Sequence, residues 1–132
     1  MIAEDLTPYA YDNNNEGGKA VNVGWLGRSY SIERPDFTVG DVPPEALAYL
    51  ERLPVMNQYR GWHTCEFCDG WLRDGKLIAD RIGNGDLRVP GLNGMVYVAP
   101  VMIRHYIREH HYRPPQEFID AIMARVVPFV QA

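Results

Sequence analysis

The sequence predicts a small α+β fold, in which an antiparallel β-meander follows a cysteine-bearing turn and precedes two C-terminal helices. Asn-Gly pairs at positions 84–85 and 93–94 separate segments rich in aliphatic residues, as hairpin turns do. Prolines stand at the start of three segments whose apolar residues recur at helical spacing. Both cysteines of the chain, Cys65 and Cys68, come just before the predicted meander.

The length of 132 residues suits a single domain spanning 1–132, which can bury roughly two thirds of its unfolded surface without a metal or disulfide. The formal charge of −4 argues against broad electrostatic capture of nucleic acid or anionic lipid, since both need a positive surface. The N-terminus lacks the basic and apolar regions of a signal peptide, and no apolar run approaches the ~20 residues that cross a bilayer. We therefore expect a cytoplasmic protein with no membrane partner.

The N-terminal residues 1–20 end in an Asn- and Gly-rich stretch that favours turns, so this segment is expected to be partly flexible. The next residues alternate in the period-2 pattern of a strand, with Val21, Val23 and Trp25 on one face.

The stretch 41–54 predicts a short amphipathic helix. Asp41 is its expected cap, two prolines occupy its first turn, and Pro54 ends it. Its apolar positions are Leu47, Leu50 and Leu53.

The meander is expected to have strands at 76–82, 86–90 and 95–99, joined by the two Asn-Gly turns. Pro90 lacks an amide donor, so its strand should end there or lie at an edge.

Two helices are expected after the meander. The first begins near Pro100, with an apolar stripe of Met102, Ile103, Tyr106 and Ile107. The second follows the prolines at 114 and 115, and its core-facing residues are Phe118, Ile119, Ile122, Met123 and Val126.

The cysteines and the first of these helices together predict a structural zinc site. Zinc prefers four thiolate and imidazole ligands, and a knuckle with a helix arriving from a hairpin is a common, treble-clef-like way to place them. The predicted ligands are Cys65, Cys68, His105 and His110. The long stretch 69–104 departs from the short spacing of a two-cysteine, two-histidine finger.

Helix geometry complicates this ligand set. Residues five apart on a regular helix point about 140° away from each other, so the last turn must tighten or unwind for His105 and His110 to reach one ion. His63, on the knuckle, is therefore a substitute ligand, and His111 is another through its proximity.

Two other interpretations of the cysteines stay open: buried inert thiols with solvated histidines, and a thioredoxin-like redox pair. The redox interpretation is weakened because no βαβ pattern surrounds the pair and because Glu66 disfavours a low-pKa thiolate.

A cluster of basic and aromatic residues on the histidine-bearing segment offers a second function. Arg104, Arg108, Arg113, Tyr106 and Tyr112 could form a face for nucleic acid. A solvated helix face is the simpler interpretation because acidic residues offset the charge.

The motifs "GWLG", "GWHTCEFC", "GNGDLRV", "GMVYVAP" and "HYIREHHYRPPQEFI" resemble those of a family of small, mostly uncharacterised bacterial proteins. The resemblance covers about 24–123. Asp86 replaces the Glu of the family pattern, and His111 stands where the family usually has Gly, which makes His110 the better ligand. The resemblance implies no reaction.

Short acidic bacterial proteins of this kind also resemble the immunity proteins of polymorphic toxin systems, which bind and mask a toxin. We therefore expect a non-enzymatic, zinc-stabilised protein-binding module, with a toxin as the candidate partner. A nucleic-acid-binding regulator is the first alternative, and a metal-dependent hydrolase with a water as the fourth ligand is the second.

Overall fold

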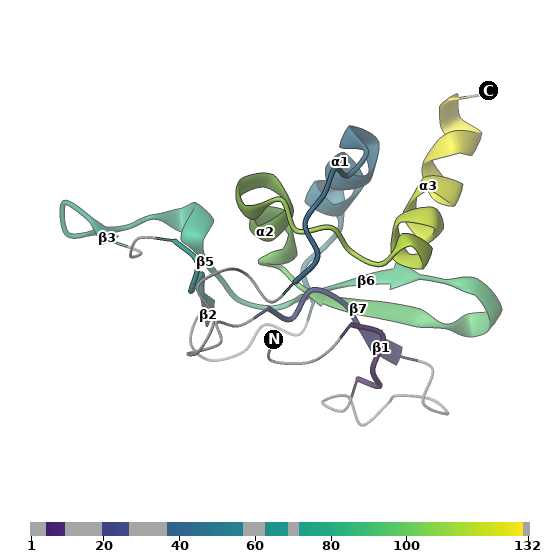
Figure 1. Cartoon of the computed structure of the whole chain (residues 1–132), viewed down its shortest axis with the longest axis horizontal. Coiled ribbons are helices and arrows are strands. Elements are labelled where there is room, and N and C mark those ends of the chain that lie inside the picture. The colour runs from purple at the N-terminus through teal and green to yellow at the C-terminus, as the bar shows by residue number, and fades with distance from the viewer. Residues whose placement is uncertain (1–4, 10–19, 27–36, 57–62, 69–71, 131–132) are drawn as a thin grey trace.

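The structure of the chain is a computed structural model that describes residues 5–9, 20–26, 37–56, 63–68 and 72–130. In this part of the chain, helices α1 (Pro44–Arg52), α2 (Ile103–His110) and α3 (Gln116–Val130) lie on one face of a small β-sheet (Figure 1). The fold is therefore α+β, as the sequence predicts.

The main sheet is mixed and has the strand order β1-β7-β6. Strand β7 (Val96–Pro100) is central and pairs in antiparallel fashion with β6 (Asp86–Pro90), whereas β1 (Ala20–Asn22) runs parallel to it on the other side. The β6–β7 hairpin and the end of its first strand at Pro90 confirm the sequence prediction. The turn η3 (Leu92–Gly94) joins the two strands, and Gly94 adopts a φ of 77° there.

The prediction that 76–82 forms the first strand of the meander is wrong. The first residues of this segment form β4 (Lys76–Leu77), which pairs with β3 (Leu72–Arg73) in a separate hairpin. The turn of that hairpin is Asp74-Gly75, with φ values of 52° and 75°. A two-residue turn with both φ values positive matches the twist of a hairpin. This Asp-Gly pair therefore directs residues 76–77 to pair with 72–73 and not with the main sheet.

The remainder of that predicted strand takes part in a third pairing. After the 3₁₀ turn η2 (Ala79–Arg81), strand β5 (Ile82–Gly83) pairs with β2 (His63–Thr64), the strand that leads into the cysteine turn. The main sheet instead gains its third strand from the N-terminal segment.

The helices follow the predicted apolar pattern. In α1, Ala46 and Leu50 are buried, while Leu47 and Leu53 pack against the same core. The expected cap at Asp41 is wrong: the residue before the helix is Pro43, and no side chain caps it. The predicted apolar residues of α2 and α3 are buried or partly buried in this core: Met102, Ile103, Tyr106, Ile107, Phe118, Ile119, Ile122, Met123 and Val126.

The strand predicted at 21–25 is shorter than expected. It ends at Asn22, because Gly24 turns the chain with a φ of 80°, and a side chain at this glycine would meet Ile103 at 2.9 Å. Trp25 therefore does not share a face with Val23; its Nε1 donates to the Val98 carbonyl at 2.9 Å on the other side of the sheet.

The face of the sheet opposite the helices is covered by the N-terminal segment. Tyr9 is buried there with Ala20 and Val98, and its hydroxyl donates to the buried Asp86 carboxylate at 3.3 Å. The Arg88 guanidinium lies over the Tyr9 ring. Residues 5–9 of the segment expected to be flexible are joined to β1 by backbone hydrogen bonds, whereas 10–19 lie outside the described residues. None of the helices in the described ranges is long and apolar enough to span a membrane.

Candidate metal centre

The turn at 65–68, here called the cysteine turn, is joined by backbone hydrogen bonds to the segment just before β6. Strand β2 pairs with β5, and the Cys65 amide donates to the Arg81 carbonyl at 2.8 Å. Gly83 of β5 lies against the start of α2, where an added Cβ would meet Val101 Cγ1 at 2.7 Å. The absence of a side chain at this glycine therefore lets the cysteine turn approach α2.

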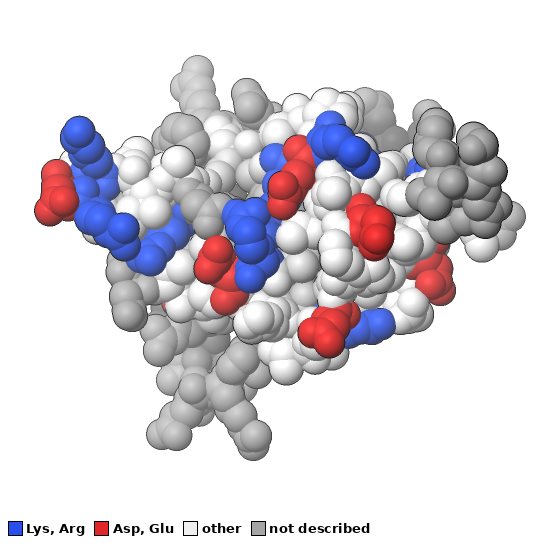
Figure 2. Space-filling view, turned by 90° about the horizontal axis from the view of Figure 1, so that it is seen from above, with Lys and Arg blue, Asp and Glu red and all other residues white. Residues whose placement is uncertain are grey.

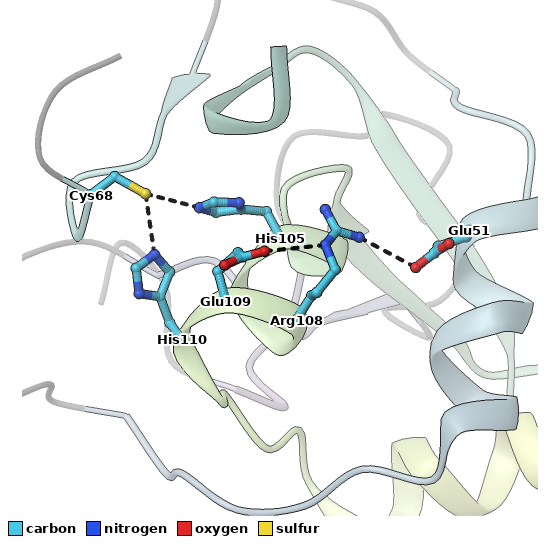
Figure 3. A network of polar contacts seen from close by, with 6 residues as sticks. All are labelled: Glu51, Cys68, His105, Arg108, Glu109 and His110. Atoms are coloured by element: carbon cyan, nitrogen blue, oxygen red, sulfur yellow. Dashed lines mark hydrogen bonds and ion pairs between the residues drawn. The ribbon is translucent and has the colours of Figure 1, made fainter. Parts of the chain in front are cut away.

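The two histidines reach this turn from α2. His105 lies on the apolar side of the helix and is 3% exposed, and its Nε2 is 3.2 Å from Cys68 Sγ. His110 Nε2 lies 3.3 Å from Cys65 Sγ and 3.4 Å from Cys68 Sγ. Figure 3 shows the thiol of Cys68 facing both imidazoles.

The four side chains form a cluster that could hold a metal ion. Their ligand atoms all lie within 4.8 Å of one another. A tetrahedral zinc site with Zn–S near 2.3 Å and Zn–N near 2.0–2.1 Å spaces its ligand atoms about 3.3–3.8 Å apart. Three of the sulfur–nitrogen distances, 3.2–3.4 Å, are close to that spacing, which fits the binding of one ion by these atoms.

The last turn of α2 unwinds, which resolves the geometric difficulty of histidines five positions apart. The His111 amide bonds the Tyr106 carbonyl five residues back, and the Tyr112 amide bonds the same carbonyl at 3.1 Å. A bond over five residues widens the turn beyond α-helical geometry, reducing the angle between side chains at these spacings. The rings of His105 and His110 are accordingly 5.0 Å apart.

The substitute ligands have different positions. His111 is exposed and ends α2 with a φ of 56°, the left-handed region that favours glycine, which accounts for the glycine at this position in the resembling family. His63 lies in β2 opposite Gly83, and its side chain is outside the described part of the structure.

An aromatic layer covers the cluster on one side, and residue type was its only signal in the sequence. The ring of Phe67, between the cysteines, lies 5.7 Å from that of His110 and 6.1 Å from that of Tyr106. Phe37, distant in sequence, packs edge-on against Phe67 at 5.1 Å. This layer and the burial of Cys65, which is 3% exposed, restrict the access of water to the cluster.

Burial also sets the protonation of the ligands. It raises the pKa of the Cys65 thiol to about 12, opposite in direction to the low-pKa thiolate of a redox-active cysteine. Burial and the neighbouring His105 lower the pKa of His110, which favours the neutral imidazole that binds metals. A cation bound at the cluster would supply the positive charge that stabilises a buried thiolate.

The arginines predicted as a basic face contact other groups of the protein. Arg104 donates to backbone carbonyls of α1, Arg108 pairs with Glu51 at 3.3 Å, and Arg113 contacts Gln116. Figure 2 shows basic side chains gathered towards one end and the middle of the face seen from above, with acidic side chains beside them.

Comparison with known proteins adds a family but no activity. A family model described as a domain of unknown function (DUF7919) matches residues 1–123, a range that contains all four cluster residues. No curated protein and no solved structure matches the chain. The chemistry must therefore be argued from the cluster itself.

Replacing His110 by Asn should abolish tight zinc binding, whereas the same change at His111 should not. Asn tolerates the left-handed conformation of residue 111, so the two variants form a matched pair. We expect His110→Asn to weaken zinc binding by more than about 100-fold, since loss of an outer-shell partner alone costs 10–100-fold. Competition with a chromophoric chelator measures both affinities. Equal losses in the two variants would contradict the assignment.

Zinc binding should strengthen as the pH rises. The raised pKa of Cys65 means that zinc must displace a proton from this thiol at neutral pH, whereas the imidazole of His110 is already largely neutral. The apparent dissociation constant should therefore fall by at least about tenfold per pH unit from about pH 6 to pH 8. The same chelator competition, repeated across this range, tests the prediction, and an affinity independent of pH would exclude ligation through Cys65.

Proposed function

We propose that this chain, which belongs to the DUF7919 family, is a non-enzymatic protein-binding module stabilised by a structural zinc ion. The observation that carries the proposal is the convergence of four ligand atoms, two sulfurs and two nitrogens, within 4.8 Å of one another. The ligands in this proposal are Cys65, Cys68, His105 and His110.

A structural role fits this ligand set better than a catalytic one. Catalytic zinc sites keep a position open for water, whereas structural sites are closed by four protein ligands. Cys65 and His105 are buried, and Phe67 packs beside His110. The carboxylate of Glu109, which a hydrolase could use as a base, lies 3.6 Å from the guanidinium of the neighbouring Arg108. These features support a closed site.

Zinc would add a bond between α2 and parts of the chain whose backbone pairing is short. Strands β2 and β5 contain two residues each, and the turn after β2 carries both cysteines. Such short pairings are marginal alone, because isolated two-stranded elements have little stability in water. A metal bridge to α2 would anchor them to the main core.

A protein partner is supported by the hairpin β3–β4, which projects from the rest of the molecule (Figure 1). Leu72 and Leu77 are cross-strand partners in this hairpin, and each is 52% exposed. Paired exposed leucines favour contact with another apolar surface. A toxin masked by an immunity protein is one such partner, and the acidic net charge of −4 suits a basic one.

Removal of zinc should destabilise one part of the chain more than the rest. Native-state hydrogen exchange should show protection lost at 63–68, 82–83 and α2, while the β6–β7 hairpin keeps its protection because its core packing is intact. The purified untagged protein should contain about one zinc per chain before chelation. Zinc-free protein with unchanged exchange on chelator treatment would refute the structural role.

The protein-binding proposal predicts weak binding to duplex DNA. The chain has a net charge of −4, and Arg108 of the proposed basic face lies 3.3 Å from the Glu51 carboxylate, so the surface lacks the excess of cations that replaces counterions on the phosphates. Titration of labelled duplex at physiological salt should give micromolar or weaker, sequence-independent binding. In contrast, nanomolar and sequence-selective binding would favour a regulator.

A further inference from the structure

The hairpin β3–β4 carries different side chains on its two faces. Leu72 and Leu77 are cross-strand partners, as are Arg73 and Lys76, and all four residues are exposed. Because successive residues of a strand point to opposite faces, the leucines lie on one face and the cations on the other. Basic side chains gather at the end of the molecule where this hairpin projects (Figure 1 and Figure 2). The hairpin is therefore apolar on one face and basic on the other.

The two cations of the hairpin are not neutralised within the described part of the chain. Neither Arg73 nor Lys76 forms an ion pair or a side-chain hydrogen bond there, and the carboxylate of Asp74 in the turn pairs with neither. Like charges directly opposite each other on paired strands are unfavourable. An anionic group placed beside both cations would relieve this repulsion.

The backbone of the hairpin has open edges. The turn 74–75 has two residues, so Arg73 and Lys76, which flank it, bond to each other, and the next pair directs its amides and carbonyls outward. That pair is Leu72 and Leu77, and in the described ranges no further backbone hydrogen bond reaches either residue. The sheet has two strands. Another strand can therefore be added at its edge.

We propose that an extended segment of a partner protein, with acidic and apolar residues in alternation, adds to the edge of this hairpin as a strand. In such pairings main-chain hydrogen bonds supply affinity and the alternating side chains supply specificity. The apolar side chains would lie beside Leu72 and Leu77, and the carboxylates, on the opposite face, beside Arg73 and Lys76. The inference rests on the proposed protein-binding function and names the chemistry of the segment that is bound.

An acidic segment is compatible with a partner that is basic as a whole. The net charge of −4 acts on the approach of the two proteins, whereas the hairpin cations act at contact. Lysine at a strand edge also protects against unwanted pairing. That role accounts for Lys76 but not for two leucines that face each other across the strands, each 52% exposed.

Titration of the isotope-labelled, zinc-loaded protein with a synthetic peptide, followed by two-dimensional NMR, tests the proposal. The probe is a capped octapeptide in which Glu and Val alternate, and it should cause saturable amide shifts confined to 72–78. A peptide with Lys in place of Glu should bind at least about tenfold more weakly, because attraction to the two cations becomes repulsion. A peptide with Ser in place of Val should also bind more weakly, because it buries no apolar surface on the leucines.

Two matched pairs of variants locate the contact. Lys76→Gln removes a cation of the hairpin, and Arg52→Gln removes an exposed cation of α1. Leu77→Thr removes an apolar side chain of the hairpin, and Leu92→Thr removes one that is 82% exposed in the turn between β6 and β7. We expect Lys76→Gln and Leu77→Thr each to weaken binding of the Glu–Val peptide by about threefold and their controls to leave it unchanged.

The zinc content of each sample reports the proposed metal centre separately. A sample that holds no zinc contradicts the proposed function, whereas zinc-loaded protein without saturable shifts at 72–78 overturns the hairpin proposal alone. Equal binding of the Glu and Lys peptides, or equal effects within the matched pairs of variants, would also overturn it. Saturable shifts of the hairpin with duplex DNA and none with the peptide would replace the protein segment by nucleic acid.

Discussion

Two sulfur atoms from the turn after β2 and two imidazole nitrogens from α2 lie within 4.8 Å of one another, and this contact joins the cysteine turn to α2. The turn is otherwise held by the two-residue pairing of β2 with β5, by the hydrogen bond from Cys65 to Arg81, and by the packing of Phe67 against Phe37 and Tyr106. Thiol–imidazole contacts alone are weak, and burial raises the pKa of Cys65, so a thiolate there needs a cation. A metal ion would replace several weak contacts by four strong ones.

Helix α2 connects this centre with the rest of the molecule because its sides contact different partners. Ile103, Tyr106 and Ile107 belong to the core, and His105 and His110 meet the cysteines. The helix is short, but its widened last turn lets one segment supply both imidazoles. The guanidinium of Arg104 is at the same time anchored to the end of α1, so that α2 connects α1 with the candidate metal centre and the core.

The sequence predicted those parts of the fold that depend on local patterns. Prolines and apolar spacing located the three helices, and Asn93-Gly94 located the β6–β7 hairpin. The four cluster residues could be identified because thiols and imidazoles are rare in this chain and have few other uses at such spacing. The sequence could not predict contacts between segments that are distant along the chain. These are the parallel pairing of β1 with β7, the contact of Arg104 with α1, and the packing of Phe37 against Phe67. The error at 76–82 arose because two turn signals, Asp74-Gly75 and Asn84-Gly85, flank the same segment, and the first of them controls its pairing.

The most direct test of the central claim is X-ray absorption spectroscopy at the zinc edge on the purified, untagged protein. It reports the kind and number of atoms bound to the metal without reference to any partner or activity. A structural site made by Cys65, Cys68, His105 and His110 predicts two sulfur atoms at about 2.3 Å and two nitrogen atoms at about 2.0–2.1 Å. A spectrum with a water or carboxylate oxygen in the first shell and fewer than four sulfur and nitrogen ligands would contradict the account and favour a catalytic metal.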